Sequence, residues 1–185
     1  MEQNDLLRYT IRSLEELEIA YMIEGSLASS AYGEPRLTND IDIVADLQLE
    51  HIPGLMTKFP AGQFYLDEEA VRREVSRRGQ FNIIHPTSGY KIDIFICGQY
   101  PFGRLELSRR HRLEAPDGEH AFFVSPEDVI LKKMEYIHIG QSERQLRDIL
   151  GMLRVQGKQI DETYIGLRAS RMGLTEIWKS ILQQV

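Results

Sequence analysis

Two aspartates stand one residue apart inside an apolar run: Asp40 and Asp42 flank Ile41, and Ile43 and Val44 follow. A short apolar run of this kind predicts a β-strand. Successive side chains of a strand point to opposite faces, so both carboxylates project from one face while the isoleucines face the core. Neighbouring carboxylates repel each other unless a cation neutralises them. The pattern therefore indicates either a magnesium site or the polar face of an edge strand.

A third aspartate is embedded in the same way, because Asp93 lies in the apolar run Lys91–Phe95. If the strand over 40–44 and the strand over 90–96 are neighbours in one sheet, three carboxylates come together. Three carboxylates can hold two divalent ions for phosphoryl chemistry. Lys91 shares a strand face with Asp93, so an ordinary ion pair between them is the alternative.

The hydrophobic periodicity divides the chain into an N-terminal α/β part over residues 1–120 and a helical C-terminal part over 121–185 that packs on it. Strands are expected over 19–23, 40–44, 81–85, 90–96 and 121–124. The segment Pro86–Gly89 predicts a hairpin between the strands over 81–85 and 90–96. Helices are expected over 4–18, 26–32, 48–58, 67–78, 126–137, 142–155, 160–171 and 173–184. Ser26 is expected to cap the second of these helices, and Ser125 the fifth.

The composition limits the classes of protein that this chain can be. Its 185 residues are 42% hydrophobic, enough for one sizeable core, and its net charge of −6 argues against a general nucleic-acid coat. A local basic patch remains open, and Arg109–Arg112 is the densest one; a solvated loop or helix end is its simpler interpretation. The single cysteine, Cys97, excludes an internal disulfide and is expected to be buried. With a polar N-terminus and no apolar run of ~20 residues, we expect a cytoplasmic protein with no membrane span.

Three segments together resemble the nucleotidyltransferase superfamily typified by DNA polymerase beta. They are Gly25-Ser26, then Arg36-Leu37-Thr38-Asn39-Asp40-Ile41-Asp42-Ile43, then Lys91-Ile92-Asp93-Ile94. The Arg-x-Thr-x-Asp-Ile-Asp segment, and Ser-Pro-Glu-Asp at 125–128 followed by Lys133, are most similar to the small prokaryotic branch that includes AbiEii-type toxins. The sequence departs from that branch at Gln145, where an Asp is usual.

The resemblance implies a mixed sheet flanked by helices and an Mg²⁺-dependent transfer of a nucleoside monophosphate from an NTP. Asp40, Asp42 and Asp93 would be the catalytic metal ligands. Gly25 and Ser26 would cradle the triphosphate, and Arg36, Thr38 and Lys133 would also bind the nucleotide. The acceptor would be an RNA end, such as that of tRNA, or a protein hydroxyl, and the branch further implies a toxin with an antitoxin partner.

Two other interpretations stay open at this stage. The first is a non-catalytic nucleotidyltransferase-fold protein that binds a nucleotide or a protein partner, which the departure at Gln145 favours. The second is an antibiotic-modifying transferase, which would need an acidic pocket to which Glu24, Glu34 and Glu127 could contribute. The five histidines show no metal-ligand spacing, so no zinc site is expected.

Overall fold

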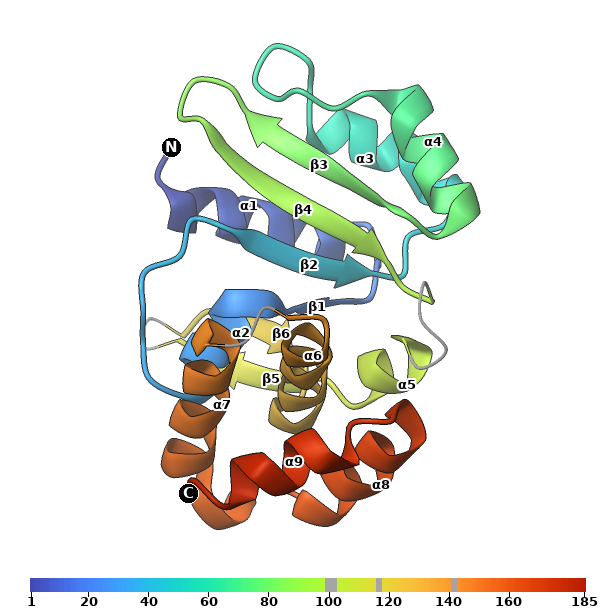
Figure 1. Cartoon of the computed structure of the whole chain (residues 1–185). Helices are drawn as coiled ribbons and strands as arrows, with labels where there is room; N and C mark the ends of the chain where they lie inside the picture. Colours follow the sequence, from blue (N-terminus) through green and yellow to red (C-terminus); the bar gives the residue numbers. More distant parts are fainter. Residues whose placement is uncertain (99–102, 116–117, 141–142) are drawn as a thin grey trace. The chain divides into compact units, whose positions relative to one another are not determined.

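The protein was studied as a computed structural model, which describes residues 1–98, 103–115, 118–140 and 143–185 (Figure 1). Its internal contacts divide the chain into two compact units. The first comprises Met1–Glu24 and Thr38–Phe123, and the second comprises Gly25–Leu37 and Val124–Val185. The early segment 25–37 thus groups with the C-terminal helices. The boundary at residue 120 between two separate domains stays a prediction.

The first unit is built on a six-stranded sheet with the strand order β3-β4-β2-β1-β6-β5. The strands are β1 (Tyr21–Ile23), β2 (Ile41–Ala45), β3 (Gln80–His85), β4 (Tyr90–Ile96), β5 (His111–Glu114) and β6 (His120–Phe123). Strands β2 and β4 run parallel, as do β1 and β6, while the other neighbouring pairs are antiparallel. The expected α/β class, with a mixed sheet flanked by helices, is confirmed.

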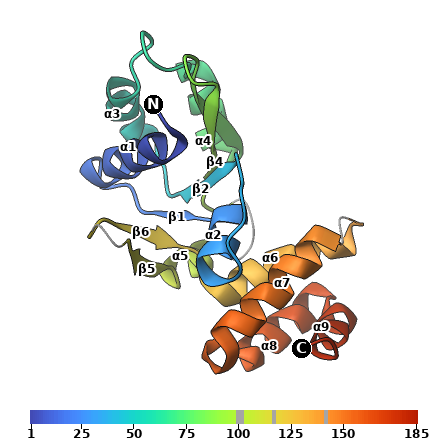
Figure 2. The same ribbon diagram turned by 90° about the vertical axis from the view of Figure 1, so that its left-hand side faces the viewer.

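The apolar face of the sheet forms the core of this unit. Ile41 and Ile43 on β2, and Ile92 and Ile94 on β4, are each at most 2% exposed, as the alternation of the sequence predicts. The helices of this unit are α1 (Gln3–Glu16), α3 (Ile52–Lys58), α4 (Glu68–Arg77) and α5 (Gly103–Ser108), with the short turn η1 (Leu49–His51) before α3. Helix α1 contacts β4 and α3, and α1 and α3 lie on one side of β2 and β4 in Figure 2.

The hairpin between β3 and β4 is confirmed, and two later elements were missed. The N–H of Gly89 donates to the carbonyl of His85 at 3.0 Å, and Gly89 has a φ of 75°, where glycine avoids the clash of a Cβ. The sequence did not predict α5 or β5. Part of the basic cluster lies on β5, an exposed edge strand, where Arg112 pairs with Glu114 at 3.0 Å. This strand shows little apolar alternation, so the sequence pattern indicates a loop or helix end here and not a strand.

The second unit is helical and has α6 as its central element. Its helices are α2 (Gly25–Tyr32), α6 (Pro126–His138), α7 (Glu143–Gln156), α8 (Glu162–Met172) and α9 (Thr175–Leu182), with the turn η2 (Gly157–Gln159). Helix α6 contacts α2, α7, α8 and α9. It begins as predicted, because the Ser125 hydroxyl accepts the N–H of Asp128 at 3.2 Å.

Two further expectations concern single features of the chain. Cys97 is 1% exposed, so its predicted burial is confirmed. Within the described ranges, none of the helices has both the length and the apolar character that crossing a bilayer requires.

Candidate functional site

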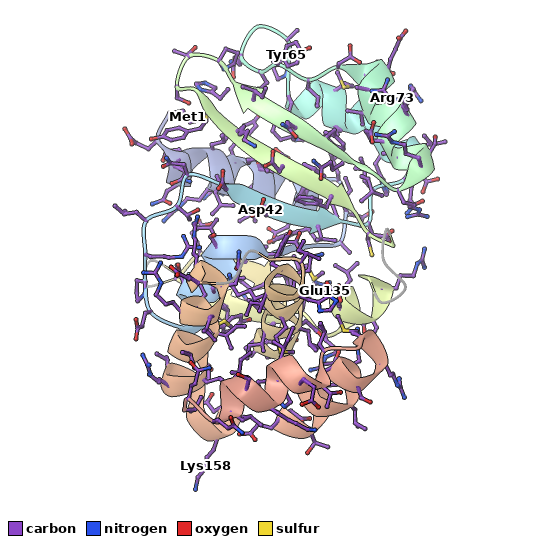
Figure 3. All side chains as sticks on the ribbon, viewed as in Figure 1. Met1, Asp42, Tyr65, Arg73, Glu135 and Lys158 are labelled. Carbon is purple, nitrogen blue, oxygen red and sulfur yellow. The ribbon has the colours of Figure 1, made fainter. Side chains whose placement is uncertain are left out.

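Two of the predicted carboxylates lie directly opposite each other on the sheet of the first unit. In the parallel pairing of β2 and β4, Asp42 is the register partner of Asp93. Figure 3 labels Asp42 on β2, and Asp40 immediately precedes that strand. By strand parity all three carboxylates project from the face opposite to Ile41 and Ile43. The expectation that the two strands are neighbours is thus confirmed, while the roles of the three residues stay predictions.

Lys91 supplies the positive charge of this acidic face. Its ammonium donates to both carboxylate oxygens of Asp93, at 2.7 and 3.0 Å. The hydrogen bond to Asp93 raises the pKa of Lys91 against the lowering effect of burial, and the charges of Asp93, Asp40 and Asp42 raise it further. The charges of all three carboxylates therefore favour the protonated form of one ammonium group.

Asn82, which the sequence motifs do not single out, extends this polar row onto a third strand. Asn82 pairs with Asp93 across the antiparallel β3–β4 ladder. With its amide oriented to donate, the Asn82 nitrogen lies 3.1 Å from Asp93 Oδ1. The available signal was the alternation of β3, in which Phe81 and Ile83 are buried and the residue between them is exposed.

The chemistry of this face suits a hard divalent cation. Across the described ranges, no set of three or more His, Cys, Asp or Glu side chains is gathered closely enough to form a ready metal centre. The potential donors are nevertheless all oxygens, and the charges of all three carboxylates raise the pKa of Lys91. Carboxylate oxygens with room for water and phosphate are the ligands that Mg²⁺ prefers. The residues present therefore fit magnesium in donor type and in charge.

Thr38 lies at the entry to β2, in the first unit. Its hydroxyl accepts the backbone N–H of Asp40 at 3.3 Å. Its carbonyl accepts a hydrogen bond from the Gln3 side chain at 3.0 Å, which ties the entry segment to α1. Thr38 thus positions the first of the three aspartates, and the role in nucleotide binding that the sequence suggested for it stays a prediction.

The Gly25-Ser26 turn opens α2 in the second unit. Gly25 has a φ of 66°, a conformation that favours glycine, and its carbonyl accepts the Ser29 hydroxyl at 2.8 Å. The helix begins at Gly25, so Ser26 lies inside its first turn and the expectation that Ser26 caps it is wrong. The Ser26 hydroxyl instead accepts a hydrogen bond from the Arg36 guanidinium.

A buried ionic network in the same unit joins two of the predicted nucleotide-binding residues. Arg36 donates to both oxygens of Asp148, at 3.1 and 3.2 Å, and Lys133 donates to Asp148 Oδ2 at 2.7 Å. The side chains of Lys133 and Asp148 are only 7% and 9% exposed. Lys133 also donates to the Gln145 side-chain carbonyl at 3.0 Å. Gln145, the departure from the toxin-like pattern, therefore still serves as a hydrogen-bond acceptor for this lysine.

The network lowers the pKa values of two of its members, Asp148 and Lys133. Burial alone would raise the pKa of Asp148, but hydrogen bonds from Arg36 and Lys133 hold it below its usual value. Burial lowers the pKa of Lys133 against the opposing attraction of Asp148, and the charges of Arg36 and Arg144 lower it further. Within the described part of the chain, Asp148 thus pairs with two cations, Arg36 and Lys133.

The Ser-Pro-Glu-Asp segment stabilises the helical unit. The Ser125 hydroxyl and the Tyr164 hydroxyl each donate to the Asp128 carboxylate at 2.7 Å. Glu127 is 5% exposed and accepts the backbone N–H of Asp161 at 3.1 Å. These contacts join the start of α6 to the start of α8. They also engage the carboxylate of Glu127, one of the residues from which the antibiotic-modifying hypothesis would build an acidic pocket.

The comparisons with known proteins concern the fold. No protein-family model and no curated protein sequence matches the chain. An antigenic nucleotidyltransferase-like protein from Paracoccidioides brasiliensis is 20% identical, with a TM-score of 0.58 over 96% of this chain and 92% of that one. The antibiotic-resistance factor ANT(2")-Ia, in complex with adenylyl-2"-tobramycin, is 12% identical, with a TM-score of 0.58 over 95% and 96%. The lincosamide antibiotic adenylyltransferase LnuA is 14% identical, with a TM-score of 0.54 over 80% and 95%.

These similarities define the class of fold. The chain has a nucleotidyltransferase-like fold, as the sequence resemblance implies, and it spans nearly the full length of each of these solved structures. At such low identity the likeness concerns the fold and does not identify the substrate.

Proposed function

We propose that this protein is an Mg²⁺-dependent nucleotidyltransferase, which moves a nucleoside monophosphate from an NTP to an acceptor hydroxyl. The observation that carries the proposal is the register of β2 and β4, which sets Asp42 opposite Asp93. The common action of Asp40, Asp42 and Asp93 on the Lys91 ammonium supports it. The fold that the chain shares with adenylyltransferases supports the reaction class.

The first unit would carry the chemistry. Magnesium held by Asp40, Asp42 and Asp93 would neutralise charge on the phosphates of the nucleotide. Asp93 accepts the proton of the acceptor hydroxyl, whose oxygen then bonds to the α-phosphorus. The bond between the α-phosphorus and the bridging oxygen breaks, and pyrophosphate leaves with its electron pair. Lys91 holds the Asp93 carboxylate in place by its two hydrogen bonds.

The second unit would hold the nucleotide through groups that recognise phosphate. Gly25 and Ser26 stand at the first turn of α2, where backbone N–H groups favour anions. Arg36 and Lys133 add positive charge. The resemblance also assigns a role in nucleotide binding to Thr38, which belongs to the first unit. These assignments come from the sequence resemblance, and the hydrogen bond between Arg36 and Ser26 is consistent with them.

The acceptor that we favour is an RNA end, such as that of tRNA, or a protein hydroxyl. We propose this acceptor, together with a role as a toxin and an antitoxin partner, because Arg36–Asp42 and residues 125–133 resemble the AbiEii-like branch. Two other functions have an observation in their favour. Lys91, which already neutralises the acidic face, favours a non-catalytic protein that binds a nucleotide or protein partner. The antibiotic adenylyltransferases among the structural neighbours favour a small-molecule acceptor.

The test is a label-transfer assay. The protein is incubated with Mg²⁺ and each α-labelled NTP, in turn with total tRNA, with cellular protein, and with tobramycin or lincomycin as acceptor. We expect label in the RNA or protein fraction, and a loss of at least ~100-fold in Asp42→Asn, because the variant removes one of the carboxylates that would hold magnesium.

A matched control separates chemistry from folding. Glu68→Gln also removes one carboxylate from the first unit, at a solvent-exposed pair with Arg72, and it should transfer label at the wild-type rate. Label transfer to an antibiotic alone would replace the proposed acceptor by a small molecule. Nucleotide binding without any transfer would leave the non-catalytic function as the explanation.

A further inference from the structure

A pocket in the second unit is lined by residues that have no role in the proposed transfer reaction, apart from Arg36. It has a volume of about 470 Å³, within the range of small-molecule sites, and residues of the α2–Leu37 segment and of α7 line it. Helices α2 and α7 are in contact and lie side by side in Figures 1 and 2. Gly25 and Ser26, the expected phosphate turn, do not line this pocket.

The charge lining the pocket is predominantly positive. Arg36, Arg144 and Arg147 line it, against the two carboxylates Glu34 and Asp148. Asp148 is already shared by Arg36 and the buried Lys133. Among the described residues, no carboxylate forms an ion pair with Arg144 or Arg147, so their charge is not neutralised within the protein.

The position of these arginines on α7 adds to the preference for an anion. Arg144 and Arg147 lie one turn apart near the N-terminus of this 14-residue helix, and Gly151 lies one turn further along, where it also lines the pocket. The N-terminal end of a helix carries partial positive charge, which adds to that of the guanidinium groups. The absence of a side chain at Gly151 leaves the floor of the pocket open beside Glu34.

The ligand chemistry follows from the donors. Guanidinium groups form paired hydrogen bonds with phosphate oxygens, and arginine is preferred to lysine at sites that bind phosphate through such pairs. A cationic ligand such as an aminoglycoside would meet repulsion from three arginines. We propose that this pocket binds a phosphate group, which belongs either to a free oligophosphate or to the backbone of a single-stranded RNA. The inference goes beyond the transfer reaction, because it needs none of the carboxylates on the sheet.

Direct binding tests the proposal on the full chain. Tripolyphosphate is titrated in a calorimeter, and a fluorescent 12-nucleotide RNA is titrated by anisotropy at several salt concentrations. We expect at least one probe to bind, and the double variant Arg144→Gln/Arg147→Gln to bind it at least ~10-fold more weakly. If RNA is the source, the slope of log affinity against log salt should shrink by about 0.7 for each arginine removed.

Controls keep the test specific to the pocket. Arg171→Gln removes an exposed arginine from α8 in the same unit and should bind as the wild type does. Asp42→Asn should also retain binding, so a failure of the proposed transfer reaction would leave this result unaffected. Tighter binding of tripolyphosphate or of RNA identifies the source of the phosphate. Binding of neither probe, or equal binding by the double variant and the wild type, overturns the proposal.

Discussion

Replacing Asp148 by asparagine should destabilise the second unit, because it removes the carboxylate that pairs with both Arg36 and Lys133. Asn has nearly the same shape, so the loss is electrostatic. Removing one partner of a buried ion pair costs about 3–5 kcal/mol. Lys133 is 7% exposed and is left without its counter-ion, whereas Arg36 is 24% exposed and regains some hydration. We therefore expect a loss at the lower end, about 3 kcal/mol, or a fall in Tm of about 6–12 °C for a chain of this length.

The assay is thermal and urea unfolding of wild type and Asp148→Asn, followed by circular dichroism at pH 7. The matched control is Glu176→Gln, which breaks an exposed pair with Lys179 in the same unit and should change stability by less than about 0.5 kcal/mol. If Asp148→Asn is no less stable than Glu176→Gln, the network does not stabilise this unit and the reasoning from burial is wrong.

Three further predictions concern single residues. Lys91→Met removes the ammonium group that pairs with Asp93, and should tighten Mn²⁺ binding by about tenfold, as measured by electron paramagnetic resonance. Unchanged or weaker binding would show that Lys91 does not compete with the metal ion for the carboxylates. Gly33→Ala should lower the free energy of unfolding by about 1–3 kcal/mol in urea, because the new Cβ would lie 3.0 Å from the Met152 backbone nitrogen; wild-type stability would show that the helices can separate at no cost. The folded pKa of Asp148 lies below its ordinary value of 3.8, so its stabilisation is complete above about pH 5 and disappears as the pH falls through the folded value. The stability gap between wild type and Asp148→Asn should therefore close in acid titrations and persist between about pH 5 and pH 7.

The features that the sequence predicts well are those with a short-range pattern. The alternation around Asp42 and around Asp93 fixes both strands, and it also fixes which face each carboxylate occupies. The cap at Ser125 and the turn before Gly89 are likewise encoded within a few residues. Local patterns of this kind act directly on the backbone, so they can be read without knowing the tertiary contacts.

The features that the sequence does not predict depend on contacts between distant segments. Arg36 and Asp148 are 112 positions apart, and no local pattern indicates that they meet. Asn82 becomes part of the polar row only through the register of β3 and β4. Strand β5 is short and polar because it lies at a sheet edge, where burial imposes no apolar alternation. The grouping of residues 25–37 with the C-terminal helices likewise depends on contacts between segments that are far apart in the sequence.

The central claim, that Asp40, Asp42 and Asp93 form one cation site, can be tested by measuring Mn²⁺ binding directly, with electron paramagnetic resonance in the presence and absence of ATP. The account predicts that Mn²⁺ binding is saturable and that ATP strengthens it. Asp42→Asn and Asp93→Asn should each weaken Mn²⁺ binding by at least ~10-fold, whereas Glu68→Gln should bind Mn²⁺ as the wild type does. Equal Mn²⁺ affinity in the wild type and in both aspartate variants would contradict the claim.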